Sequence, residues 1–210
     1  MKKLLFLTAI AVLTLNSSIA QEDTSSDEGI SFGVKVGGIL SGLTKNDNIF
    51  PLASYNIGAV VNIGVSEKFS IQPEVVYSAQ GTEFSFFLSS FGRLKLDYIN
   101  IPVMASFELL KGLTIQAGPQ IGFNLSAKYQ KTNSQNWNDV KDDIESTDYG
   151  VAFGIQYEFH FGMFFQARYA MGLSDVFSSY TEITALGVDT SYFSGDPNSK
   201  VLSLSVGFLF

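Results

Sequence analysis

Residues 201–210 read VLSLSVGFLF, in which apolar residues alternate with small or polar ones up to the terminal Phe210. A repeat of two residues places successive side chains on opposite faces of a β-strand. One face of this strand would carry Leu202 and Leu204, and the other would carry Ser203. An alternating strand that ends the chain on an aromatic residue is typical of a bacterial outer-membrane β-barrel.

The N-terminus has the features of a secretory signal peptide. Lys2 and Lys3 precede a largely apolar run over residues 4–15, and Ser18 and Ala20 supply the small residues of a cleavage site. This run is too short for a helix that spans a bilayer, and no later apolar run reaches about eighteen residues. An exported chain without such a helix can cross a membrane as a closed β-barrel.

The predicted organisation is a signal peptide at residues 1–20, a flexible lead-in at 21–29 and an outer-membrane barrel domain at 30–210. The chain has no cysteine, so disulfide and thiol chemistry are excluded. Its formal charge of −7 becomes −9 once Lys2 and Lys3 are removed, which argues against nucleic acid as a partner.

Eight segments of the chain, including the C-terminal one, show this alternation. In one of them, Tyr149 and Phe153 share a face, while Gly150 and Gln156 share the other. The polar faces are rich in Gly and Gln and poor in charge, which favours a crowded barrel interior over a solvated sheet face. The predicted fold is an all-β, eight-stranded antiparallel up-and-down transmembrane β-barrel. The predicted strands are 30–40, 53–65, 69–80, 94–109, 113–129, 147–159, 163–173 and 200–210.

The links between these segments alternate between long and short. Outer-membrane barrels have short periplasmic turns and long external loops. An even number of strands with this rhythm predicts that both termini are periplasmic and that all four long loops are extracellular. The long links are 41–52, 81–93, 130–146 and 174–199, and the short ones are 66–68, 110–112 and 160–162.

Four motifs in matching order resemble the PorT-like outer-membrane β-barrel family of Bacteroidetes-type bacteria. They are Tyr98–Pro102 (YINIP), Gly118–Gly122 (GPQIG), Asp148–Gly150 (DYG) and Ala167–Leu173 (ARYAMGL). Members of that family often carry Glu where Asn100 stands here. The family name comes from a member that is needed to export proteins across the outer membrane, so the resemblance implies a barrel of the envelope and a candidate link to secretion.

Six charged residues fall on the inward faces of the predicted strands. Glu74 and Arg168 lie at similar heights on opposite sides of the barrel, so we expect their side chains to pair near its axis. An eight-stranded barrel is just wide enough for side chains to fill it. We therefore favour an ion-pair network that fills the lumen over a proton or ion path. The six residues are Lys35, Glu74, Glu108, Asp148, Glu158 and Arg168.

Other chemistry-bearing residues lie outside the strands. The single histidine, His160, falls in a short turn at the periplasmic end, which disfavours a lipid-modifying enzyme because that chemistry needs a histidine near a serine at the external side. The acidic loop residues match no calcium-binding spacing and are interpreted as solvated. They are Asp139, Asp142, Asp143, Glu145, Asp175, Glu182, Asp189 and Asp196.

Aromatic residues in the third and fourth long loops could form a recognition surface or could pack on one another. They are Tyr129, Trp137, Tyr180, Tyr192 and Phe193.

These features predict a non-enzymatic integral outer-membrane protein with a structural or protein-interaction role through its external loops. The alternative is a small-ligand binding or narrow transport barrel, and a lipid-modifying enzyme is less favoured. No catalytic, cofactor-binding or metal-binding residue is predicted. The expected partners are outer-membrane lipid, the barrel-insertion machinery that would recognise Phe210, and an envelope or secretion protein.

Overall fold

The C-terminal strand closes the sheet against the first strand of the chain. In the computed structural model, β9 (Ser199–Leu209) pairs antiparallel with β1 (Ile30–Leu43), from Leu43 opposite Ser199 to Gly33 opposite Leu209. The structure describes residues 29–43, 49–86, 89–131, 136–174 and 198–210. The predicted signal peptide and the lead-in up to residue 28 therefore lie outside the described residues.

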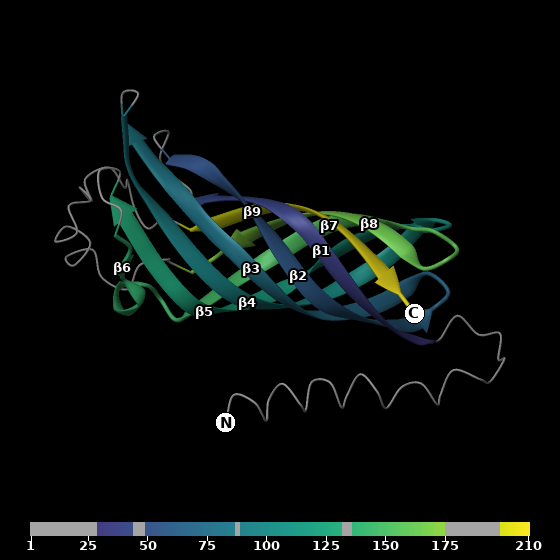
Figure 1. Cartoon of the computed structure of the whole chain (residues 1–210). Coiled ribbons are helices and arrows are strands. Elements are labelled where there is room, and N and C mark those ends of the chain that lie inside the picture. The colour runs from purple at the N-terminus through teal and green to yellow at the C-terminus, as the bar shows by residue number, and fades with distance from the viewer. Residues whose placement is uncertain (1–28, 44–48, 87–88, 132–135, 175–197) are drawn as a thin grey trace.

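Eight long strands form a closed antiparallel barrel, which confirms the predicted fold class (Figure 1). Each long strand pairs with the next long strand along the chain, including β4 with β5 and β5 with β7, and the β1–β9 pairing closes the ring. No helix in the described residues is long and apolar enough to cross a membrane. The remaining elements are β2 (Ile49–Ser66), β3 (Phe69–Phe86), β4 (Ser89–Leu110), β5 (Leu113–Lys131), the two-residue β6 (Asn138–Asp139), the 3-10 helix η2 (Lys141–Asp143), β7 (Thr147–Glu158) and β8 (Met163–Gly172).

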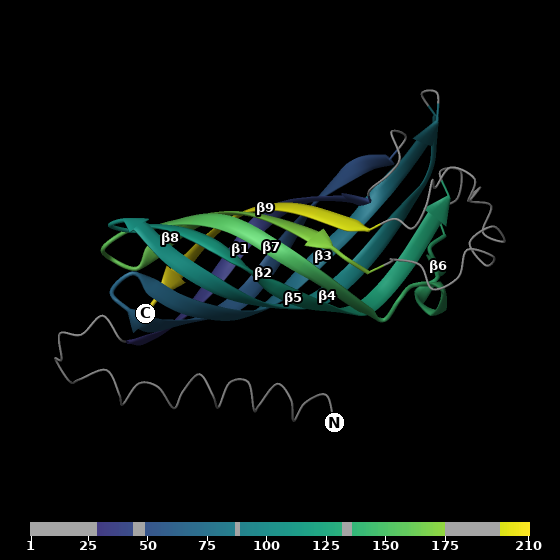
Figure 2. The same cartoon turned by 180° about the vertical axis from the view of Figure 1, so that it is seen from behind.

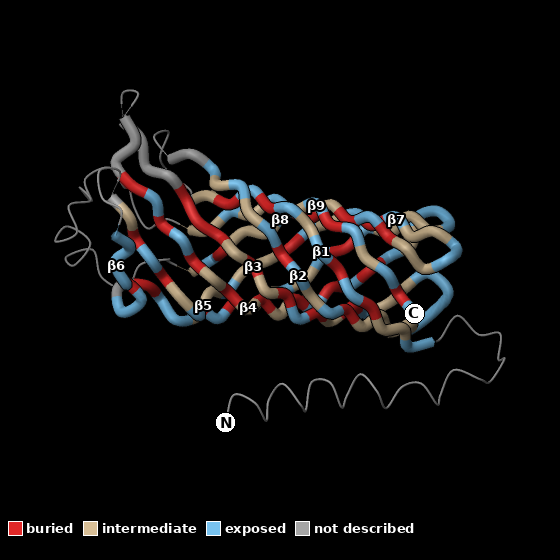
Figure 3. Tube along the Cα trace, viewed as in Figure 1, coloured by how far each residue is buried: buried red, intermediate tan, exposed pale blue. Residues whose placement is uncertain are grey.

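Burial alternates along each strand as the sequence predicts (Figure 3). On β2 the Ile57 side chain is exposed on the outer surface and its neighbour Asn56 is buried in the lumen. On β9 the same holds for Leu204 and Ser205. The outer surface is therefore apolar and the middle of the interior is polar, the reverse of a water-soluble barrel and the pattern of one that faces lipid.

The beginning of β1 and the end of β9 lie at the same end of the barrel, together with the three short turns (Figures 1 and 2). We call this the terminal end and the other the distal end. Two of its turns contain glycines at positive φ, Gly112 at 81° and Gly162 at 91°. A Cβ at Gly162 would also collide with the carbonyl oxygen of Leu209, so only glycine fits this turn.

The predicted long links were wrong in their extent at the distal end. The first, 41–52, is reduced to residues 44–48, and the second, 81–93, to residues 87–88, because the flanking strands continue to pair. Strand residues that project beyond the membrane need no apolar outer face, so the alternation that marks a strand fades there. The third link contains β6 and η2, and most of the fourth lies outside the described residues.

The barrel is taller on one side than on the other. Strands β3, β4 and β5 have 18, 22 and 19 residues, whereas β7, β8 and β9 have 12, 10 and 11. About 9–11 tilted residues suffice for a transmembrane strand. The additional residues of β3–β5 lie at the distal end, because β5 pairs with β7 only as far as Phe123. We call this projection the tall side.

Candidate functional site

Three charged side chains from three strands meet inside the barrel. Arg168 of β8 donates from Nη1 to Oε2 of Glu74 at 2.7 Å and from Nη2 to Oε1 at 2.7 Å. Lys35 of β1 donates from Nζ to Oε2 of Glu74 at 2.6 Å. All three residues are buried, with exposures of 2–6%. The predicted pairing of Glu74 with Arg168 is confirmed, and Lys35 is a third member of this lumen triad.

Small neighbours leave room for these long side chains. Lys35 is paired with Gly58 of β2 on one side and with Gly207 of β9 on the other. Arg168 is paired with Gly154 of β7. Paired residues of neighbouring strands point to the same face of the sheet. Glycines beside the lysine and the arginine therefore allow both side chains to extend across a lumen that is only wide enough for close-packed side chains.

A layer of four buried glutamines surrounds the triad. Gln72 donates to Oε1 of Glu74 at 2.8 Å, and Lys35 donates to Oε1 of Gln166 at 2.8 Å. Gln166 in turn donates to Gln116 and Gln156, each at 3.0 Å. These glutamines belong to the Gln-rich polar faces of the strands, but the sequence did not predict a role for them. Together with the triad they fill the middle of the lumen with hydrogen-bonded side chains.

The other inward charges do not join the triad. Asp148 accepts hydrogen bonds from Ser174 at 2.6 Å and Ser199 at 2.8 Å, and so fixes both ends of the fourth long link. Glu108 accepts a hydrogen bond from the backbone N–H of Gly112 at 2.7 Å, in a short turn. The expectation of a lumen ion-pair network is thus met at its centre. Asp148 and Glu108 instead bond to a link and a turn, and Glu158 lines the pocket at the terminal end.

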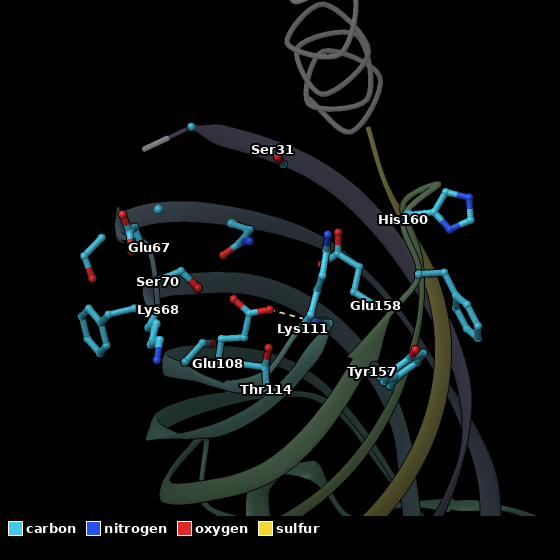
Figure 4. A pocket seen from close by; sticks show the side chains of 18 residues that line it. Ser31, Glu67, Lys68, Ser70, Glu108, Lys111, Thr114, Tyr157, Glu158 and His160 are labelled. Atoms are coloured by element: carbon cyan, nitrogen blue, oxygen red, sulfur yellow. Dashed lines mark hydrogen bonds between the residues drawn. The ribbon is translucent and has the colours of Figure 1, made fainter. Parts of the chain in front are cut away.

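A polar pocket of about 660 Å³ opens at the terminal end (Figure 4). Its walls carry both signs of charge, with Glu67, Lys68, Glu108 and Lys111 among the lining residues. His160 lies in the predicted turn at the margin of this pocket and is exposed, with its ring edge-to-face against Phe161 at 5.4 Å. Figure 4 shows the imidazole turned away from Glu67 and Ser70, an arrangement that offers no serine–histidine pair.

An apolar cluster orders the tall side at the distal end. Leu94 and Leu96 of β4 lie opposite Tyr129 and Ala127 of β5, and all four are buried. The segment after β6 is tied to this cluster, because the backbone N–H of Val140 donates to the carbonyl of Ala127 at 3.0 Å. We call this the rim cluster, and it consists of Leu94, Leu96, Ala127, Tyr129, Val140 and Ile144, each at most 6% exposed.

Of the two aromatic residues predicted in the third loop, Trp137 lies there, but Tyr129 belongs to β5 because that strand continues to Lys131. Tyr129 is buried in the rim cluster, whereas Trp137 is 37% exposed and lies beneath the ammonium group of Lys95, 4.5 Å from the ring centroid. The aromatic residues Tyr180, Tyr192 and Phe193 and the fourth-link carboxylates lie outside the described residues. The described part of the chain contains no group of three side chains suited to a metal ion.

A family model and several solved structures show which proteins this chain is similar to. Residues 19–178 match the family model of the outer membrane protein beta-barrel domain. Neisserial surface protein A, from Neisseria, has 14% identity and a TM-score of 0.53, over 87% of this chain and 100% of that chain. OprG from Pseudomonas aeruginosa has 9% identity and a TM-score of 0.48, over 90% and 99%. The attachment invasion locus protein Ail of Yersinia pestis has 14% identity and a TM-score of 0.47, over 87% and 99%. No curated protein matches the chain.

Proposed function

This chain belongs to the outer membrane protein beta-barrel domain family, and on that premise we propose that it is a non-enzymatic membrane protein that binds a partner protein outside the cell through its tall side. The terminal end would face the periplasm and the distal end the exterior. This orientation is supported by the short turns at the terminal end, because barrels of this class have short periplasmic turns and longer external segments.

The observation that carries the proposal is the excess length of β3–β5. The 22 residues of β4 are about twice what a membrane crossing needs, so roughly half of that strand projects from the bilayer. Strand pairing and the buried rim cluster stabilise the described part of this projection. An ordered surface binds a partner without the entropic cost of ordering a loop.

The exposed surface of the tall side has the residues of an interaction site. Trp137 is partly exposed and held by Lys95, and Lys95 lies opposite the exposed Lys128 of β5. Aromatic residues with a limited choice of rotamers are frequent anchors in protein interfaces. Because Asp139 of β6 lies opposite Lys128, this surface carries both signs of charge and favours a partner with a polar, charged surface. The resemblance to the PorT-like family makes a component of a secretion machinery the first class of partner to test.

Transport through the lumen is less well supported than binding. The triad and its glutamines occupy the middle of the barrel, and the buried Phe164 lies with Val60 and Leu209 nearer the terminal end. The pocket at the terminal end gives a second candidate function, the binding of a small polar ligand from the periplasm, because its walls hold both ammonium and carboxylate groups.

Photo-crosslinking tests the proposed interaction. With a photoreactive phenylalanine analogue in place of Trp137, we expect a protein adduct in intact cells, to be identified by mass spectrometry. Phe161 is the matched control, because it is an exposed aromatic residue at the terminal end. The same adducts from both positions, or lipid adducts alone from the Trp137 position, would contradict the proposal.

A substitution at Phe210 tests whether the barrel-insertion machinery recognises the C-terminal residue. Its side chain is 64% exposed on the outer surface, while its backbone N–H and carbonyl both bond to Phe32. Phe210→Ala keeps these backbone bonds and removes the ring, so we expect a severalfold lower yield of folded protein in the outer membrane. Phe208→Ala on the same face of β9 is the control. Equal yields of the two variants in membrane fractions would remove Phe210 from the recognition signal.

A further inference from the structure

The lumen triad carries one more positive charge than negative charge. Lys35 and Arg168 both bond to Oε2 of the single carboxylate Glu74, so two cationic groups lie within a few ångströms of each other in a buried site. The glutamine and serine side chains around them are neutral. A net charge held away from water is unfavourable unless a counter-ion or a change of protonation removes it.

A cavity of about 40 Å³ adjoins the triad on its distal side. Lys35 and Arg168 line it, and the described lining residues include no Asp or Glu. The other polar groups around it are amides and hydroxyls that can donate hydrogen bonds, and they are Asn56, Ser78, Gln80, Asn100, Gln120 and Ser203. Both residues therefore line a cavity whose described lining does not include their shared carboxylate Glu74.

One donor of the arginine is also left without an acceptor. Nε of Arg168 is buried and has no hydrogen-bond partner, although both terminal nitrogens of the guanidinium are bonded to Glu74. Buried donors in folded proteins nearly always have a partner. A buried water needs roughly 10–15 Å³, so this cavity can hold a small ion together with water.

We propose that the cavity beside Lys35 and Arg168 is a binding site for a small monovalent inorganic anion such as chloride. The anion neutralises the excess charge of the triad and accepts hydrogen bonds from the surrounding amides and hydroxyls. Its role is to stabilise the closed barrel. The site lies within the filled lumen and is independent of the interaction surface proposed for the tall side.

Anion exchange at constant ionic strength tests the site. The purified barrel is unfolded in urea in sodium bromide and in sodium gluconate, whose anion is too large for the cavity. A ligand bound only by the folded state lowers the unfolding equilibrium constant about tenfold when its concentration is about nine times Kd. We expect a rise of the urea midpoint with bromide, and an anomalous-scattering peak in the cavity of crystals grown in bromide.

Variants separate site binding from general salt effects. Lys35→Met leaves a neutral pair of Glu74 and Arg168, so this variant should still fold. Its urea midpoint should be the same in bromide as in gluconate. Lys68→Met, in a short turn at the terminal end, should keep the higher urea midpoint in bromide. The same midpoint in both salts for the unchanged protein, an equal bromide effect in Lys35→Met, or an empty cavity in the bromide crystals would each overturn the proposal.

Discussion

Replacing Glu74 with Gln is expected to destabilise the barrel by about 3–5 kcal/mol, the usual cost of removing one partner of a buried ion pair. The change leaves the side chain almost unaltered in shape, but Lys35 and Arg168 then face each other with no negative charge between them. The free energy of unfolding in urea, followed by the gel shift of the folded barrel, measures the effect. Glu67→Gln, in an exposed turn, is the matched control and should stay within about 0.5 kcal/mol of the unchanged protein.

A double variant shows whether the charges act as one network. Arg168→Met alone leaves Lys35 to neutralise Glu74, so its cost should be smaller than that of Glu74→Gln. In the double variant a single cation remains, and its total cost should be less than the sum of the two single costs. Additive costs would mean that the two residues are not energetically coupled, in spite of their two hydrogen bonds.

Phe164→Ala should have an effect of similar size, about 3–5 kcal/mol, because a fully buried aromatic side chain is replaced by a cavity. Phe164 packs with Val60 and Leu209 inside the barrel, and its ring occupies the space that Gly207 leaves open. Equilibrium unfolding in urea again gives the measurement.

Its neighbour Phe165 provides a control on the same strand. Phe165 is 51% exposed on the outer surface, so Phe165→Ala opens no internal cavity and should cost well under half as much. If both alanine variants were equally destabilised, the packing of Phe164 in the interior would contribute no more to stability than the contact of Phe165 with lipid or detergent.

The sequence was sufficient to predict the eight strands, their facing and the common end of the barrel at which β1 begins and β9 ends. Each of these follows from the two-residue repeat and from the alternation of link lengths, which are local properties. The distal strand ends were not predicted, because residues such as Gly81, Thr82 and Gly92 pair in the structure without the apolar face that marks a membrane strand. The burial of the rim cluster residues was not predicted, for the same reason.

The lumen was predicted in part. The facing of each strand indicated that Glu74 and Arg168 point inward, and their similar heights suggested a pair. The inclusion of Lys35 could not be deduced, because the height at which β1 meets β3 and β8 across the lumen depends on the stagger of the closed barrel. Sequence spacing along single strands does not determine that stagger.

The residues that meet in the lumen are far apart in the chain, and this affects the order in which the protein folds. Arg168 and Glu74 are 94 positions apart, and Lys35 and Gln166 are 131 positions apart. Contacts between residues so distant in sequence form late, because much of the chain must first be ordered, and proteins rich in such contacts fold slowly. The ionic cluster can therefore assemble only as β1 and β9 approach each other. Substitutions in it should mainly accelerate unfolding, while the early, locally paired hairpins keep their rate of formation.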